Sequence, residues 1–346
     1  MQLIPDFPLW LNALAFACSA TVVWISGARL AYLADELADR FHLAKSLVGL
    51  LFLSLATSLP EVATTLSAAV QQSRDLVLNN LFGGIALQTA ILATADFWVR
   101  GSITNYPRKA NHALEATLLV LLLALTLILV QLGEPLAGAH IGLGSIVIGV
   151  AYIGAIWLLR GYDNASDWVP IDLPDPDDAA FPIFRSTGDQ DSRTLFWLTG
   201  AGCGAILIFG ILLVTFADRI ATQSGLGTGF IGVTLLAAAT SLPELTTSIA
   251  AVRIGAYTMA ISNIFGSNLI MLVLVLPADI LFLPGPILQN ASQTVGLALS
   301  FGIAVTSVYL IGLIVRRKPR VGALGIDSVL VLALFAASLV AYYWAR

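Results

Sequence analysis

The string Thr-Ser-Leu-Pro-Glu occurs twice in this chain, at residues 57–61 and again at 240–244. On a helix, residues three and four apart share one face, so each copy brings a carboxylate and two hydroxyls together. Proline has no N–H group, so Pro60 frees the carbonyl of Ala56, and Pro243 frees that of Ala239. All of these donors are hard oxygens, which suit Ca²⁺ or Na⁺ better than softer metals. The predicted cation ligands are Thr57, Ser58, Glu61, Thr240, Ser241 and Glu244.

Two asparagines, Asn80 and Asn263, stand directly before an apolar residue and the pair Phe-Gly. A single Asn in a membrane helix more often bridges helices, at about 0.6–2 kcal/mol. These two occupy equivalent positions after the two Thr-Ser-Leu-Pro-Glu strings, so we interpret them as further ligands of the predicted site.

The elements that carry these residues are predicted to span a membrane. The chain has 346 residues, of which 58% are hydrophobic and 11% charged, whereas soluble domains carry about a quarter charged residues. A span needs about 20 mainly apolar residues. We predict ten, at 8–32, 44–72, 76–98, 112–132, 138–160, 194–217, 227–252, 256–284, 290–315 and 322–344. Polar residues with glycine or proline interrupt spans two, three, seven and eight, which are therefore expected to be bent or broken.

The basic residues orient these spans. Of the 17 Lys and Arg, all but Arg74, Arg219 and Arg346 fall on one side of the ten-span arrangement. The positive side is cytoplasmic, so both termini are expected outside. The first apolar run lacks the basic n-region of a cleavable signal peptide. Compact loops and the absence of a targeting segment favour a multi-pass protein of a bacterial plasma (inner) membrane, whose immediate partner is the lipid bilayer.

The two halves of the chain repeat at a constant offset, without gaps, from Ala34 and its equivalent Ala217 to Asp96 and its equivalent Asp279. The predicted units are a five-span half at 1–160, with its repeated segment at about 44–98, an acidic cytoplasmic linker at 161–193, and a second half at 194–346, with its repeated segment at about 227–284. Five is an odd number, so the second half enters the membrane with opposite polarity, as in the inverted repeats of many secondary transporters.

Such repeats place the ion site near the bilayer midplane, where the halves meet. Glu61 and Glu244 lie about 17 residues into spans two and seven, near the middle of the predicted spans. A carboxylate at that depth costs roughly 2.5–3.5 kcal/mol, and a cation held between the two compensates for it. A purely structural Thr-Ser-Pro kink is the alternative for one copy, but it does not explain a buried Glu in both.

Other acidic residues have simpler interpretations. The linker carries eight Asp against Arg185 and Arg193, which is typical of a solvated segment; a regulatory calcium site is the alternative. Asp96 and Asp279 are repeat-equivalent but lie toward the ends of their spans, where a structural role is favoured over a vestibule or proton-path role. Glu115 and Asp327 sit close to span starts, where they are predicted to stabilise the helix ends.

Several functional classes are disfavoured. His42, His112 and His140 lie in or beside predicted loops, and no catalytic constellation is visible, so neither an enzyme nor a cofactor is predicted. The two cysteines, Cys18 and Cys203, have no disulfide or metal-site spacing. Nucleic-acid binding is not predicted, because no basic stretch is interleaved with aromatic residues. The sequence does not predict an oligomeric state.

These motifs resemble the alpha repeats of the sodium/calcium exchanger family, within the Ca²⁺/cation antiporter superfamily. The resemblance rests on the paired Thr-Ser-Leu-Pro-Glu strings and on Asn-Ile-Phe-Gly-Ser-Asn at 263–268, and it covers nearly the whole chain. It implies an all-α fold of ten transmembrane helices in two inverted five-helix repeats. It also implies that the Thr, Ser, Glu and Asn positions above, with Ser267 and Asn268 as further candidates, bind Ca²⁺ and Na⁺ alternately, while spans one and six slide against a rigid core.

The chain departs from the family pattern in two ways. Gly84 and Ile85 stand in the first half where the second half has Ser267 and Asn268. Asn80 and Asn263 are both neutral, although one of these positions is often Asp in the family, so the site offers two negative charges instead of three. The expected function is Ca²⁺/Na⁺ antiport. The open alternatives are a cation/proton exchanger, a cation channel, which lacks the expected rings of pore-lining groups, and a transport-inactive paralogue.

Overall fold

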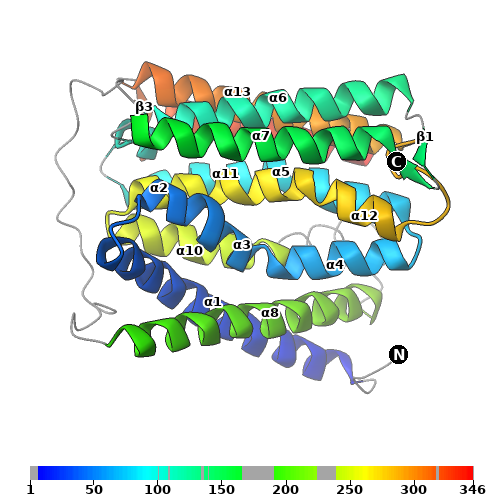
Figure 1. Cartoon of the computed structure of the whole chain (residues 1–346). Coiled ribbons are helices and arrows are strands. Elements are labelled where there is room, and N and C mark those ends of the chain that lie inside the picture. The colour runs from blue at the N-terminus through cyan, green and yellow to red at the C-terminus, as the bar shows by residue number, and fades with distance from the viewer. Residues whose placement is uncertain are drawn as a thin grey trace.

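The computed structural model is built almost entirely of helices (Figure 1). It describes residues 7–99, 101–107, 110–133, 136–138, 140–165, 191–223, 239–316 and 319–345. The helices are α1 (Leu9–Arg40), α2 (Lys45–Leu47), η1 (Val48–Leu53, a π-helix), α3 (Ser54–Thr57), α4 (Leu59–Val70), α5 (Arg74–Thr94), η2 (Ala95–Trp98), η3 (Ile103–Asn105), α6 (Asn111–Leu132), α7 (Leu143–Ala165), α8 (Ser192–Gln223), α10 (Leu242–Arg253), α11 (Tyr257–Val273), α12 (Val275–Leu281), α13 (Gln293–Val315) and α14 (Ile326–Trp344). Two short antiparallel hairpins, β1 (Leu136–Gly138) with β2 (Ile141–Gly142) and β3 (Arg320–Val321) with β4 (Leu324–Gly325), precede α7 and α14.

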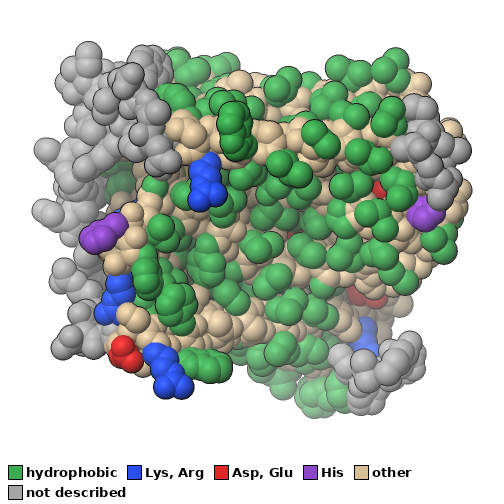
Figure 2. Space-filling model, in the orientation of Figure 1, with side chains coloured by type: hydrophobic (Ala, Val, Ile, Leu, Met, Phe, Trp, Pro, Cys, Tyr) green, Lys and Arg blue, Asp and Glu red, His purple; other side chains and the backbone are tan. Residues whose placement is uncertain are grey.

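Most of the predicted spans are present. Within the described residues, eight helices are long and apolar enough to cross a membrane, and a bent helix pair brings the number up to nine. The start of the predicted seventh span and most of the acidic linker lie outside the described residues. Hydrophobic side chains cover the middle of the face in Figure 2, and most visible charged side chains lie toward the two ends, as a membrane-embedded surface requires.

The second span is broken, as predicted. Its two parts, Lys45–Thr57 and Leu59–Val70, meet at an angle of 52°. Ser58 leaves the helical conformation at φ −81° and ψ 2°, and Pro60 follows within the first turn of α4, where a missing N–H has no cost. Ser241 and Pro243 repeat this arrangement at the start of α10. Two of the candidate ligands, Ser58 and Ser241, therefore lie at the breaks, and Glu61 and Glu244 follow in the first turn of the next helix.

The third span was expected to be bent or broken, and the expected break is wrong. Helix α5 is continuous from Arg74 to Thr94. It contains no proline, and its paired glycines, Gly83 and Gly84, face open space and fit into the helix without a break. The eighth span is interrupted at Leu274 between α11 and α12, where Pro277 removes the N–H that would bond to the carbonyl of Val273.

The sequence repeat reappears in the boundaries of the elements. Helices α4 and α10 begin at the equivalent residues Leu59 and Leu242, and α7 and α14 begin at the equivalent residues Leu143 and Ile326. Figure 1 shows α1 and α8 side by side with opposite chain directions. The repeat therefore extends beyond the segment in which the sequence displays it.

Helices α5 and α11 form the centre of the molecule. In Figure 1, α6, α7 and α13 cover one side of them, and α1 and α8 lie on the other. In the most apolar stretch, 72% of the residues of α11 and α12 are buried, but only 17% of those of α1. The candidate site thus lies on well-packed elements, and α1 and α8 form a peripheral pair.

Two repeat-equivalent glycines bring this peripheral pair close to the site helices. A Cβ atom on Gly210 of α8 would overlap Cγ of Pro60, and one on Gly27 of α1 would lie 3.2 Å from Cβ of Thr246. Each long helix therefore contacts the N-terminal part of α4 or α10 in the opposite half.

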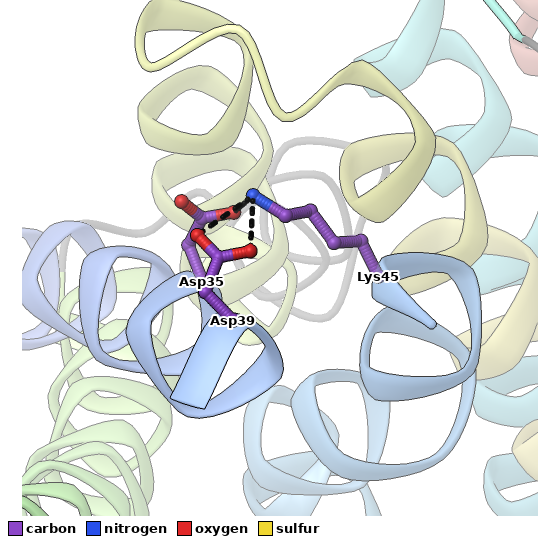
Figure 3. Close-up of polar contacts among 3 residues, drawn as sticks. All are labelled: Asp35, Asp39 and Lys45. Atoms are coloured by element: carbon purple, nitrogen blue, oxygen red, sulfur yellow. Dashed lines mark hydrogen bonds and ion pairs between the residues drawn. The ribbon is translucent and has the colours of Figure 1, made fainter. Parts of the chain in front are cut away.

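An ion pair ties the end of α1 to the start of α2 (Figure 3). The Nζ atom of Lys45 lies 2.6 Å from Oδ1 of Asp35 and 3.2 Å from Oδ1 of Asp39. The repeat retains Asp35 as Asp218 but has Thr228 in place of Lys45, so the tether belongs to the first half alone.

Candidate functional site

The two motif glutamates meet in the interior. Glu61 lies in the first turn of α4 and Glu244 in the first turn of α10, and both are buried. Oε1 of Glu244 lies 3.2 Å from the hydroxyl of Ser58, three residues before Glu61, which brings the two motifs together. The N-terminal ends of two helices point their partial positive charge toward this region, which favours negative groups there.

One half of the site is held together by contacts between the two repeats. The hydroxyl of Ser58 lies 3.2 Å from Oε1 of Glu244 and 2.9 Å from Oγ of Ser267. Ser267 lies 3.4 Å from the same Glu244 oxygen. The hydroxyl of Thr57 donates to the carbonyl of Ser54 at 3.2 Å and also lies within reach of the Glu244 carboxylate. Of the predicted ligands, Thr57, Ser58, Glu244 and Ser267 thus gather at one place.

The remaining carboxylate oxygens accept no hydrogen bond from the described residues. These are both oxygens of Glu61 and Oε2 of Glu244. Buried polar atoms are normally paired, and an unpaired carboxylate in a membrane interior is costly. Buried carboxylate oxygens at the starts of two helices, without a donor among the described residues, fit a cation.

The two asparagines bond to threonines of the neighbouring helix. Asn80 of α5, which is half-buried, donates to Oγ1 of Thr65 at 2.9 Å. Asn263 of α11 donates to Oγ1 of Thr247 at 3.1 Å, and Thr247 donates in turn to the carbonyl of Pro243 at 2.8 Å. These bonds fix the amide groups, and the Oδ1 atom of Asn263 stays buried without a described donor. The threonines were missed because their role depends on which helices are neighbours.

Two further buried amide side chains lie on the same helices, Asn268 on α11 and Gln88 on α5. Asn268 donates to Oγ1 of Thr89 at 3.3 Å, and its own Oδ1 is buried without a described donor. The Oε1 atom of Gln88 is also buried without a described hydrogen-bond donor. Gln88 was not predicted, although it lies eight residues after Asn80 and so on the same face of α5. Its repeat partner is the apolar Met271.

The other predicted positions are placed as follows. Thr240 and Ser241 are buried at the break before α10, as Thr57 and Ser58 are before α4. A Cβ atom on Gly84 would have no neighbour within 4 Å, and Ile85 packs 3.4 Å from the position that a Cβ atom on Gly302 would take. The first half therefore supplies neither a hydroxyl nor an amide where the second half has Ser267 and Asn268.

Asp96 and Asp279 have structural partners in the opposite halves. Asp96 accepts the backbone N–H of Gly325 at 2.9 Å, and Asp279 accepts that of Gly142 at 2.8 Å. Gly142 and Gly325 are themselves equivalent positions of the repeat. Each acid thus anchors the hairpin of the other half, which supports the structural interpretation over a vestibule role.

The donor chemistry is restricted to hard oxygens. Among the residues that the structure describes, no group of three or more His, Cys, Asp or Glu side chains is arranged to hold a metal ion. The site instead combines two carboxylates with hydroxyl and amide oxygens. Such a donor set suits Na⁺ or Ca²⁺, and it does not provide the nitrogen and sulfur ligands that softer metals select.

Comparison with known proteins identifies the family of the chain. The model of the family described as "Sodium/calcium exchanger protein" matches residues 11–160 and 194–344. The chain is 27% identical over 337 residues to inner membrane protein YrbG of Escherichia coli, covering 93% of this chain and 94% of that protein. It is 35% identical over 119 residues to mouse sodium/potassium/calcium exchanger 1, a match to 33% of this chain and 10% of that protein.

The fold also matches a solved transporter. A structure of the sodium-calcium exchanger NCX_Mj superimposes with a TM-score of 0.70 at 17% identity, covering 96% of this chain and 99% of that chain. At this identity the likeness concerns the fold, and it agrees with the arrangement of long helices around α5 and α11.

Proposed function

The chain belongs to the sodium/calcium exchanger protein family and is a membrane cation antiporter, and from this premise we propose that it exchanges Ca²⁺ against Na⁺ at Glu61 and Glu244. The observation that carries the proposal is the set of three buried carboxylate oxygens without a described donor. Two carboxylates are neutralised by one Ca²⁺ or by two Na⁺, and both ions prefer hard oxygen ligands. Competition for the same oxygens couples the two ions.

Alternating access follows from how the site is held. We propose ten transmembrane helices in two inverted halves, with both termini outside a bacterial inner membrane. The proposal is supported by the constant spacing between equivalent helix starts and by the opposite directions of α1 and α8. In it, the peripheral pair α1 and α8 moves against the core and exposes the site to one side at a time.

A cation/proton exchanger is the second candidate, because of the charge count. Asn80 and Asn263 are neutral amides, so the site holds two carboxylates and no third acid among the described residues. Two protons can neutralise this pair as completely as one Ca²⁺. The same oxygens would then serve Ca²⁺/H⁺ exchange.

Ion replacement in proteoliposomes tests the proposal. Vesicles loaded with Na⁺ and diluted into choline buffer with ⁴⁵Ca²⁺ should accumulate calcium while the pH is clamped equal on both sides. Vesicles loaded with choline at the same pH are the control and should not accumulate it. Uptake that requires a proton gradient and ignores Na⁺ would favour the second candidate, and no uptake with either gradient would contradict both.

A further inference from the structure

A polar pocket lies at one end of the molecule, between the α4–α5 turn and the segment that follows α12. It is a cavity of about 410 Å³. Its lining residues are Gln72, Ser73, Arg74, Asp75, Phe282, Pro284 and Asn290. Figure 1 shows the ends of α4 and α12 near β1, at the end of the molecule opposite β3. Glu61 lies in the first turn of α4 and the pocket follows the last turn, so the length of α4 separates the two sites.

Gln72 joins the two walls of this pocket. Its Oε1 atom accepts the backbone N–H of Leu283 at 2.7 Å, and its Nε2 atom donates to the carbonyl of Leu281 at 3.2 Å. The backbone of Gln72 is left-handed, with a φ of 60°, which is uncommon for a residue other than glycine. Its repeat equivalent, Gly255, has the same conformation with a φ of 76°. Hydrogen bonds across the turn therefore hold the pocket in shape.

The two charged residues of the pocket do not neutralise each other. Adjacent residues of a helix point in different directions, so Arg74 and Asp75 do not face one another. The Cζ atom of Arg74 lies 5.1 Å from the ring centroid of Phe282, and its Nε atom is buried without a hydrogen-bond partner among the described residues. Neither charged side chain has an ion-pair partner in the described part of the chain. The pocket thus offers one positive and one negative group to a ligand.

The pocket lies where the apolar surface ends. Large apolar side chains stand beside it: Val70 ends α4, Leu76 follows Asp75, and Leu283 follows Phe282, and all three are exposed. Exposed apolar side chains next to charged ones are typical of the boundary between the hydrocarbon and the headgroups of a membrane. The ligands present at the highest local concentration at this boundary are phospholipid headgroups, which basic pockets between membrane helices bind.

The charges of the pocket select among headgroups. Arg74 repels a bare cation and Asp75 repels a bare anion, so a ligand with both charges fits best. In phosphoethanolamine, the phosphate suits a guanidinium, and the N–H donors of the primary ammonium suit the Asp75 carboxylate and the Asn290 amide oxygen. Phosphocholine has no N–H donors and is recognised by the faces of aromatic rings, but the ring of Phe282 already faces Arg74.

The equivalent place in the other half of the protein is closed. Tyr257 is the repeat equivalent of Arg74, and its ring centroid lies 4.2 Å from that of Tyr106. Both tyrosines are buried. The equivalent of Asp75 is the neutral Thr258. The packing of the repeat therefore requires neither charge, and a need other than packing must account for Arg74 and Asp75.

We propose that this pocket binds the phosphoethanolamine headgroup of a phospholipid, with Arg74 at the phosphate and Asp75 at the ammonium. The inference does not depend on which ions the protein exchanges. A bound headgroup connects the α4–α5 turn to the segment after α12. Because the lipid binds only the folded protein in this way, it should raise the unfolding midpoint.

Thermal unfolding of the full chain in detergent micelles tests the proposal, with dihexanoyl-phosphatidylethanolamine as the probe. The midpoint of the wild type should rise with this lipid and rise less with the phosphatidylcholine or phosphatidylglycerol of the same chain length. Arg74→Gln should raise the half-saturating fraction of the ethanolamine lipid roughly tenfold, because hydrogen bonds between charged groups are lost. Asp75→Asn should remove the preference for ethanolamine over choline.

The exposed Arg320 of β3, at the opposite end of the molecule, supplies the matched control. Arg320→Gln should leave the response to each lipid unchanged, and midpoints without added lipid establish that each variant is folded. Equal stabilisation of the wild type by the three lipids, or an unchanged response of the folded Arg74→Gln and Asp75→Asn variants, would overturn the proposal. Equal stabilisation by soluble glycerophosphoethanolamine at the same concentration would overturn it as well, because the occupant would then be a soluble molecule and not a lipid.

Discussion

Replacing Gly210 of α8 by alanine should disturb the cation site from outside it. The new Cβ would overlap Cγ of Pro60 and lie 3.0 Å from its Cβ, and Pro60 is the residue that precedes Glu61. These atoms belong to a proline ring in the first turn of α4, so they cannot rotate away. Either α8 moves outward or the start of α4 moves, and both routes alter the position of Glu61.

The change in stability caused by Gly210→Ala is the difference between two opposing effects. Overpacking of this kind costs about 1–3 kcal/mol. An alanine in a helix gains roughly 0.5–1 kcal/mol over glycine. The net destabilisation should therefore centre on about 1 kcal/mol and reach at most about 2.5 kcal/mol. If about 1 kcal/mol of this destabilisation appears as weaker cation binding at Glu61, the half-saturating cation concentration rises roughly fivefold.

Gly204 supplies the matched control on the same helix. A Cβ on Gly204 would meet no heavy atom within 4 Å, so Gly204→Ala should leave stability and uptake unchanged or slightly improved. The assay is a thermal unfolding midpoint in detergent together with cation uptake into vesicles at several cation concentrations. Equal midpoints and equal half-saturation for the two variants would refute the reasoning that α8 bears on the first turn of α4.

Three further substitutions separate binding from structure. Ser267→Ala removes contacts to Ser58 and Glu244 and should raise the half-saturating cation concentration about two- to tenfold, since one hydrogen bond contributes about 0.5–1.5 kcal/mol; an unchanged uptake curve would remove Ser267 from the site. Asp279→Asn should lower the unfolding midpoint, because a buried charged acceptor of backbone N–H groups is lost at about 1–3 kcal/mol, while the folded fraction keeps its cation affinity. Lys45→Met should cost less than about 1 kcal/mol and only in low salt, because its side chain is 34% exposed; a large loss in high salt would contradict an ionic tether.

The sequence predicted the parts of the site that depend on local chemistry. The repeated proline dictates a break near each Glu, and the breaks occur at Ser58 and Ser241. The recurrence of the motif predicted that the two copies come together, and Ser58 of one copy does contact Glu244 of the other. The break in the third span was wrong because glycine, unlike proline, keeps its backbone N–H and so removes no hydrogen bond from the helix.

The sequence did not predict which residues of one half contact which residues of the other. Helical spacing assigns a residue to a face, but it does not say which helix faces it. The contact between Ser58 and Ser267 joins residues 209 positions apart, and the bond of Asn80 to Thr65 depends on how α4 and α5 pack. The burial of His112 and Glu115 was not predicted for the same reason. Residues at the start of a span are expected at the surface unless the neighbouring helices are known.

The assignment of Glu61 and Glu244 as ligands of the transported cation can be tested by ⁴⁵Ca²⁺ uptake driven by an outward Na⁺ gradient. Glu61→Gln and Glu244→Gln keep the size of each side chain and remove its charge. We predict robust uptake by the wild type and none by either variant. The unfolding midpoints of both variants in cation-free buffer should be no lower than that of the wild type, because an unpaired buried charge is removed. Uptake at the wild-type rate in either folded variant would contradict the assignment.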